Sequence, residues 1–439
     1  NEAGNATYTN SAISLAKYFR ISGTNDVNEI MMNKGENLLQ YEDFGIFLKP
    51  SYIQKSESNN EGNEENTVTR PLFEQAYEPS FPTLNFVEIE QTWRRPYWMS
   101  EDGAVIYGAY GAQLIQSKDE WTTKVQVGTV SLPQTILAIR TLADGELLIY
   151  CSRNEAQSIK GKLYKTVGYD RNDPSVATFK EVFEILSTQA DINNTWGLSV
   201  YQNVVVANEY GLRGANGAKH VYLSTDYGET FNLIFNLYTQ EVAGRPLLTD
   251  SAHTHTAAYD PYYNRIWVAV GDRPNTASYF SDDLGQTWTF IQGSEEVQYT
   301  GIQALPDCVI FGSDRAPNGV YVYYRNGKDK HPIIQPLFII NDSEELTNVF
   351  GLPFKKDWHP TTPTYFVADK TEGTNYKPQI IATVDGRKAH FMYEHPTSVR
   401  MWAALGPTAQ GNIITVIQPE SSPNGLVILK ATAPNWIKV

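Results

Sequence analysis

From about Trp93 onward, the chain alternates short runs of apolar and polar residues. These runs are rich in Val, Ile, Tyr and Thr, and turn residues interrupt them roughly every 8–12 positions, which is typical of consecutive β-strands. Because side chains alternate between the two faces of a strand, this period predicts half-buried strands. A helical pattern occurs near the start, in "NSAISLAKYF", which has apolar residues at Ile13, Ala16 and Tyr18. The pattern therefore predicts an all-β region after a segment of mixed structure.

The strands fall into repeated units. One unit comprises "HTHTAAYD", "RIWVAVGD", "ASYFSDD" and "TWTFIQ", and the unit before it comprises "WGLSVY", "NVVVANEYG", "KHVYLSTD" and "TFNLIFNL". We recognise about seven units of roughly 50 residues, and repeats of this length with four strands each are the signature of a β-propeller. The sequence therefore predicts an all-β protein, a β-propeller of about seven four-stranded blades, with about six to eight possible.

A propeller has to cover the edge strands of its first and last blades. The segment "LNFVEIEQ" (Leu84–Gln91) resembles an outer strand that can complete the last blade, and the C-terminal "NWIKV" can do the same. We therefore expect residues 81–439 to form the propeller. Residues 1–80 do not share the repeat and contain the acidic loop "SESNNEGNEEN". We expect them to form a small mixed segment for attachment or oligomerisation.

Charge and composition narrow the classes of partner. The chain has 49 acidic and 35 basic residues and a net charge of −14, so a nucleic-acid partner is not expected, because that role needs clustered basic residues. It has no apolar run of roughly 18 residues, so no membrane span is expected. The start lacks the basic and apolar regions of a signal peptide. The cysteines, Cys151 and Cys308, lie in apolar runs; buried free thiols are favoured, with a disulfide as the alternative.

An eight-residue pattern, Ser-x-Asp-x-Gly-x-Thr-aromatic, occurs twice. It is "STDYGETF" (Ser224–Phe231) and "SDDLGQTW" (Ser281–Trp288), and a weaker copy, "SKDEWTT", starts at Ser117. Glycine permits the left-handed backbone of a tight turn, and the short polar side chains can bond its backbone groups. We predict a structural turn between the third and fourth strand of a blade. Its residues are Ser224, Asp226, Gly228, Thr230, Ser281, Asp283, Gly285, Thr287 and Trp288.

The motif resembles the Asp-box of sialidases, the bacterial neuraminidase repeat. In that family the Asp-box lies on the face opposite the active site, which implies a role in the fold rather than in chemistry. The resemblance also extends to "WRRPYWMSEDG", where Arg94, Arg95 and Pro96 are similar to the Arg-Ile-Pro motif that opens the first sialidase blade. It implies a secreted glycoside hydrolase as one reading, although no catalytic residue can be assigned.

The strand order of a blade places candidate site residues at one mouth. Inner strands start, and second strands end, on the face opposite the predicted turns. Charged and aromatic groups there suit a polar, ring-shaped ligand, and equally they can tie neighbouring blades together. The second-strand ends contribute Arg153, Glu209, Asp272, Arg273, Asp314, Arg315, Asp369 and Lys370, and the inner-strand starts contribute Trp196, His253, His255, Trp402, Arg94 and Arg95.

The segment "HTHTAAYD" contains the clearest candidate binding residues at this mouth. His253 and His255 are two positions apart on a strand, so they are expected to point the same way. Such a pair can bond a ligand, bond its neighbours, or ligate a metal with Asp272 as a third ligand. No fourth ligand is evident, so we expect ligand binding or structural bonding. We predict no metal and no cofactor.

The stretch from "HTHTAAYD" to "LPDCVIFGSDRAPNGVYV" resembles propellers in bacteriophage tail-fibre and receptor-binding proteins. This resemblance implies recognition of a bacterial cell-surface polysaccharide at the mouth. It also implies contacts with other virion proteins through the N-terminal segment, with a homo-oligomer possible. The expected location is the virion tail or the extracellular space. The sialidase-like hydrolase is the alternative.

Overall fold

The computed structural model divides the chain into two compact units, Asn1–Tyr77 and Glu78–Val439. In the first unit, β1 (Gln40–Tyr41) and β2 (Ile46–Phe47) form an antiparallel pair. The expected helix in "NSAISLAKYF" and the acidic loop lie outside the described residues. The structure describes residues 40–41, 46–47, 83–193, 197–211, 217–249, 251–272, 274–314, 317–325, 332–341, 347–351, 364–370, 377–383, 385–419 and 425–433.

The second unit consists of antiparallel four-stranded sheets, and we call each sheet a blade. Blade 1 contains β4 (Arg95–Met99), β5 (Ile106–Tyr110), β6 (Gln113–Ser117) and β7 (Val125–Gln126). Blade 2 contains β8 (Ile136–Thr141), β9 (Leu147–Cys151), β10 (Lys162–Val167) and β11 (Thr178–Glu184). Blade 3 contains β13 (Leu198–Tyr201), β14 (Val204–Asn208), β16 (His220–Ser224) and β17 (Asn232–Asn236). Blade 4 contains β18 (His253–Asp260), β19 (Arg265–Gly271), β20 (Ala277–Ser281) and β21 (Thr289–Phe290).

The other blades follow in chain order. Blade 5 contains β22 (Tyr299–Ala304), β23 (Cys308–Ser313), β24 (Asn318–Tyr324) and β25 (Gln335–Asn341). Blade 6 contains β26 (Thr347–Gly351), β27 (Thr364–Lys370), β28 (Gln379–Thr383) and β29 (Ala389–Glu394). Blade 7 contains β30 (Val399–Leu405), β31 (Asn412–Pro419), β32 (Leu426–Thr432) and β3 (Val87–Thr92). A short extra pair joins β12 (Ala190–Asp191) to β15 (Tyr210–Gly211).

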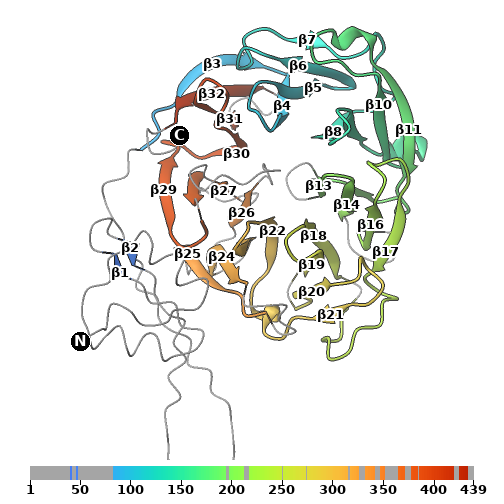
Figure 1. Ribbon diagram of the computed structural model, residues 1–439, viewed down its shortest axis with the longest axis vertical. Coiled ribbons are helices and arrows are strands. Elements are labelled where there is room, and N and C mark those ends of the chain that lie inside the picture. Colours follow the sequence, from blue (N-terminus) through green and yellow to red (C-terminus); the bar gives the residue numbers. More distant parts are fainter. Residues whose placement is uncertain are drawn as a thin grey trace, which may run out of the picture. The chain divides into compact units, whose positions relative to one another are not determined.

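The blades surround a common centre (Figure 1), toward which the first strand of each blade lies. The prediction of an all-β propeller is therefore confirmed, with seven blades. Within the described ranges there is no α-helix, only three short 3₁₀ turns. The same ranges contain no helix long and apolar enough to cross a membrane.

The ring closes through a strand from the start of the propeller. β3 pairs antiparallel with β32, with Val87 opposite Lys430 and Thr92 opposite Leu426. The expectation for "LNFVEIEQ" is therefore confirmed, whereas "NWIKV" lies outside the described residues. An N-terminal strand therefore completes the C-terminal blade and covers the outer edge of β32.

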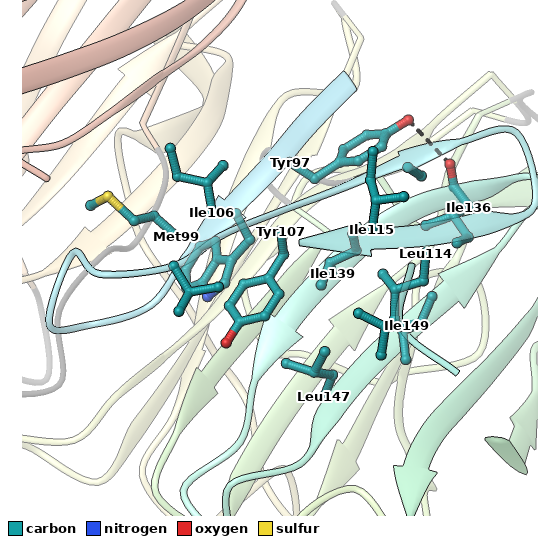
Figure 2. Close-up of a cluster of buried hydrophobic side chains, with 14 of the residues drawn as sticks. Tyr97, Met99, Ile106, Tyr107, Leu114, Ile115, Ile136, Ile139, Leu147 and Ile149 are labelled. Atoms are coloured by element: carbon teal, nitrogen blue, oxygen red, sulfur yellow. Dashed lines mark hydrogen bonds between the residues drawn. The ribbon is translucent and has the colours of Figure 1, made fainter. Parts of the chain in front are cut away.

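The cores lie between neighbouring blades. One cluster joins blades 1, 2 and 7, and it includes Ile106, Leu114, Ile149 and Leu405, all at most 2% exposed. Figure 2 shows part of this cluster, with the Tyr97 hydroxyl donating a hydrogen bond of 3.1 Å to the carbonyl oxygen of Ile136. Apolar burial of this kind is the main favourable term in folding, so each blade depends on its neighbours.

The two eight-residue motifs form the same turn, each between the third and fourth strand of a blade. Asp226 accepts hydrogen bonds from the Ser224 hydroxyl at 2.7 Å and from the Thr230 hydroxyl at 2.6 Å. Gly228 and Gly285 have φ values of 75° and 92°, in the left-handed region that favours glycine. In the second copy, Asp283 accepts the corresponding bonds from Ser281 and Thr287. The turn and its position between the third and fourth strands are therefore confirmed, and its structural role stays a prediction.

The weaker copy in blade 1 keeps the hydrogen bonds without the glycine. Asp119 accepts from the hydroxyls of Ser117 and Thr123 at 2.8 and 2.7 Å. Trp121 stands where the other copies have glycine, with a φ of 74°, and its side chain is buried. Because a bulky residue is strained at positive φ, burial of the indole offsets a local backbone cost.

Candidate functional site

The strand register defines two opposite faces of the propeller. In blade 4, His253 at the start of β18 pairs with Gly271 at the end of β19. Ser281, the first residue of the polar turn, pairs instead with Ile266, near the other end of the blade. We call the face where inner strands start and second strands end the mouth. Because every blade has the same strand order, the inner-strand starts and second-strand ends of all blades lie on this one face.

β-Bulges interrupt the start of several inner strands. The register shifts by one residue at five such positions, and the extra residues are Tyr97, Leu137, His255, Thr300 and Trp402. A bulge adds a residue that has no opposite partner and re-aims its side chain. His255 is one of these extra residues, so the regular alternation of "HTHT" is interrupted there.

The histidines and Asp272 nevertheless lie together. The rings of His253 and His255 have centroids 4.6 Å apart, and each lies edge-on to Tyr210 at 5.7 and 5.9 Å. His255 Nε2 lies 3.5 Å from Asp272 Oδ1. Gln298 from the start of blade 5 donates a hydrogen bond of 2.7 Å to the same carboxylate oxygen. The predicted grouping of these three residues within one blade matches this geometry.

Glu209 is enclosed rather than open to the mouth. Its side chain is fully buried, and its carboxylate accepts hydrogen bonds from the Tyr222 hydroxyl at 2.6 Å and the Ser187 amide at 3.0 Å. Its Oε2 lies 2.9 Å from His220 Nδ1. Burial acts to raise the pKa of Glu209, but the hydrogen bonds, led by His220, outweigh it and hold the pKa below its ordinary value. These contacts tie the residue that follows β14 to β16 of its own blade and to Ser187 in the segment between blades 2 and 3.

Arg153 is engaged by acidic groups at the edge of blade 2. Its guanidinium lies 2.7 Å from Glu155 and 3.2 Å from Asp191, in salt bridges. Asp191 also accepts from the Tyr150 hydroxyl at 2.9 Å, and burial raises the pKa of Asp191. Asp314, at the end of β23, is half-buried, and its amide donates to the Gln298 carbonyl at 3.0 Å. Of the other predicted residues, Arg273, Arg315 and Trp196 lie outside the described residues.

A second cluster lies where blade 7 meets blade 1. The Arg95 guanidinium lies 4.2 Å from the centre of the Trp402 ring and 4.7 Å from that of Tyr97. The Arg400 guanidinium lies 5.3 Å from the same Trp402 ring, and its Nε is 3.7 Å from Asp369 Oδ2. Arg94, the preceding residue, is exposed. In the part of the chain that the structure describes, no carboxylate lies within salt-bridge distance of Arg95.

Burial lowers the pKa of Arg95, with a smaller contribution from Arg400 in the same direction. Two guanidinium groups therefore share one aromatic residue, and this arrangement suits an anionic group. Sequence reasoning missed Arg400, Tyr97, Tyr210 and Gln298. Alignment of the inner-strand starts, with one extra residue allowed, would have found Tyr97 and Arg400.

Comparisons with known proteins concern the fold. No protein-family model matches the sequence, and no curated protein matches it. Solved structures similar to this chain include a virginiamycin B lyase from Staphylococcus aureus (11% identity, 79% of this chain and 98% of that chain, TM-score 0.48). Others are the WD40 β-propeller domain of Doa1 (11%, 79% and 97%, 0.46) and a Trypanosoma rangeli sialidase (10%, 79% and 60%, 0.42). This chain therefore spans less than two thirds of the sialidase chain.

Proposed function

We propose that the propeller binds an acidic carbohydrate of the bacterial cell surface at its mouth. The observation that carries the proposal is the Arg95 guanidinium, stacked on Trp402 at 4.2 Å. Among the described residues, this guanidinium has no carboxylate at salt-bridge distance. A planar guanidinium held on an aromatic ring presents its N–H groups to carboxylate or phosphate oxygens.

The neighbouring groups support the same ligand class. Arg400 adds a second cation beside Trp402, and the half-buried Trp402 offers an aromatic surface for the C–H groups of a sugar ring. The histidines of blade 4 lie on the same face, as expected from the sequence. Attachment to a virion tail through residues 1–80 is part of the proposal and is supported by the sequence resemblance alone. The assignment of the three polar turns as Asp-boxes is also part of the proposal. Their shared hydrogen bonds support it.

A sialidase-like hydrolase is the second candidate. It is favoured by Arg95 and Pro96, which open the inner strand β4 as the sequence resemblance implies. Cleavage of a glycosidic bond, however, needs two catalytic groups at a set separation. Asp369, a carboxylate beside this cluster, accepts a hydrogen bond of 2.9 Å from the Met401 amide and faces Arg400. Because this carboxylate is already engaged, we favour binding over cleavage.

The two functions separate in one experiment. Purified capsular polysaccharides, teichoic acids and sialylated glycans would be arrayed, and binding of the full chain would be measured together with released reducing ends. We expect binding to acidic glycans, no release of sugar, and loss of binding in Arg95→Ala. Arg171→Ala is the matched control, because Arg171 pairs with Asp102 in a turn of the opposite face. Release of an acidic sugar would establish the hydrolase. If Arg95→Ala bound acidic glycans as tightly as the unmodified chain, the proposed site would be refuted.

A further inference from the structure

We propose that His253, His255 and Asp272 bind a divalent transition-metal ion, with Zn²⁺ as the best match. One ligand atom from each of the three side chains lies within 4.8 Å of the others. Two imidazoles and one carboxylate form a ligand set that suits Zn²⁺ and similar borderline ions. This site goes beyond the proposed glycan binding and does not depend on it, because the Arg95 cluster lies on different blades.

The separation of the ligand atoms fits a shared ion. Zinc bonds are about 2.0–2.1 Å to nitrogen and about 2.0–2.2 Å to oxygen, so two ligands of a tetrahedral ion lie about 3.3–3.5 Å apart. His255 Nε2 and Asp272 Oδ1 are 3.5 Å apart. The ring of His253 lies beside that of His255, with centroids 4.6 Å apart, and its ligand atom is within 4.8 Å of the other two.

His255 provides an independent reason to expect a ligand. Its side chain is 1% exposed, and neither ring nitrogen makes a hydrogen bond. A buried polar group that lacks a partner costs free energy, so native proteins rarely keep one without a role. A metal ion bonded to Nε2 would satisfy the nitrogen that faces Asp272.

The surrounding backbone holds these side chains in place. His255 is the bulge residue of β18, and its imidazole lies against Gly271, where an added Cβ would be 2.5 Å from Nε2. Gln298 donates to Asp272 Oδ1 and thereby orients the carboxylate from the neighbouring blade. Outer hydrogen bonds of this kind fix metal ligands and tune their affinity.

Three protein ligands leave a fourth tetrahedral position. Asp272 is the least buried of the three, with a side chain 15% exposed, so this position faces the mouth. Water or an oxygen of a bound molecule would occupy it, as in zinc sites that keep an open position. The metal would thus lie where ligands reach the propeller.

The test uses the full chain after treatment with a chelator. Calorimetric titration with ZnCl₂ should reveal one equivalent of tightly bound Zn²⁺, and Co²⁺ should give the visible absorption of a tetrahedral N/O site. His255→Ala should weaken Zn²⁺ binding at least about 100-fold. His395→Ala is the matched control, because His395 bonds Thr397 and lies outside the cluster, and it should bind Zn²⁺ like the unmodified chain.

Two further variants keep the test decisive if His255→Ala fails to fold. Asp272→Asn removes a ligand charge from a partly exposed position. Gln298→Ala removes the hydrogen bond that orients Asp272, and a loss of Zn²⁺ affinity of about 10–100-fold is expected. Circular dichroism would establish that each variant is folded. Absence of stoichiometric Zn²⁺ binding, or equal binding by folded Asp272→Asn, would overturn the proposal. Arg95→Ala should keep full Zn²⁺ affinity, which separates this site from the proposed glycan site.

Discussion

The Arg95 guanidinium stacks on Trp402, 4.2 Å from the ring centre, so the first residue of β4 meets the bulge residue of β30. These strands belong to the first and last blades, which the pairing of β3 with β32 joins. The contact therefore forms only when the ring has closed. A binding site built on it is complete only in the fully folded propeller.

The Arg95 contact leads to a prediction about affinity. Arg95→Ala should weaken binding of an acidic glycan at least tenfold, about 1.4 kcal/mol, because a charge-assisted contact is lost. Arg95→Lys should restore little, since an ammonium group lacks the planar shape that stacks on Trp402. Calorimetry with a purified acidic polysaccharide measures both variants. If exposed Arg94 were the ligand-binding arginine, Arg94→Ala would cause the loss instead.

Glu209 is expected to matter for stability rather than for binding. Glu209→Ala would leave His220, Ser187 and Tyr222 without their shared acceptor, at a cost of about 3 kcal/mol or more. Denaturant unfolding of the variant measures this cost. A variant with unchanged unfolding free energy and lost glycan binding would contradict the structural role.

The Glu209 carboxylate also makes the stability of the fold depend on pH. Because the pKa of Glu209 is lowered in the folded state, its contribution is complete above the unfolded value of about 4.3 and is lost as the pH falls through the folded pKa. We therefore expect stability to fall with acidification below about pH 4, with a shallower fall in Glu209→Gln. Unfolding curves recorded from neutral to acidic pH test this, and equal slopes in the two proteins would exclude Glu209 as the cause.

The polar turns should act on stability alone. Asp226→Ala and Asp283→Ala each remove an acceptor of several hydrogen bonds, so a loss on the order of 2 kcal/mol is expected. Asp119→Ala should behave in the same way, because the turn without glycine has the same bonds. Thermal unfolding and glycan binding should be measured together. Weaker binding at an unchanged melting temperature would place the turns in the site.

The cysteines should be inert while the protein is folded. Cys151 and Cys308 are free and buried, and burial raises the pKa of each thiol to about 12. The preference for free thiols over a disulfide is thus confirmed. At about pH 8 only about one thiol in 10⁴ would be ionised, so DTNB should label neither residue until denaturant is added. Rapid labelling of the native protein would show that a thiol is accessible.

Much of the fold followed from local patterns in the sequence. The alternation within strands, the spacing of the repeat and the turn motifs predicted the blade and its strand order, and "LNFVEIEQ" indicated the closing strand. These features depend on neighbours along the chain or on one strand beside another. The mouth followed from them, since strand order alone decides which ends share a face.

The environment of each site residue was decided by tertiary structure. A bulge at His255, the enclosure of Glu209 and the stacking of Arg95 on Trp402 depend on how blades pack, which a period of two in the sequence does not encode. The sequence by itself therefore determined the propeller and the face on which charged groups gather. Only the packed ring decided which of those groups satisfy one another and which remain available to a ligand, because that choice depends on contacts between residues far apart in the chain.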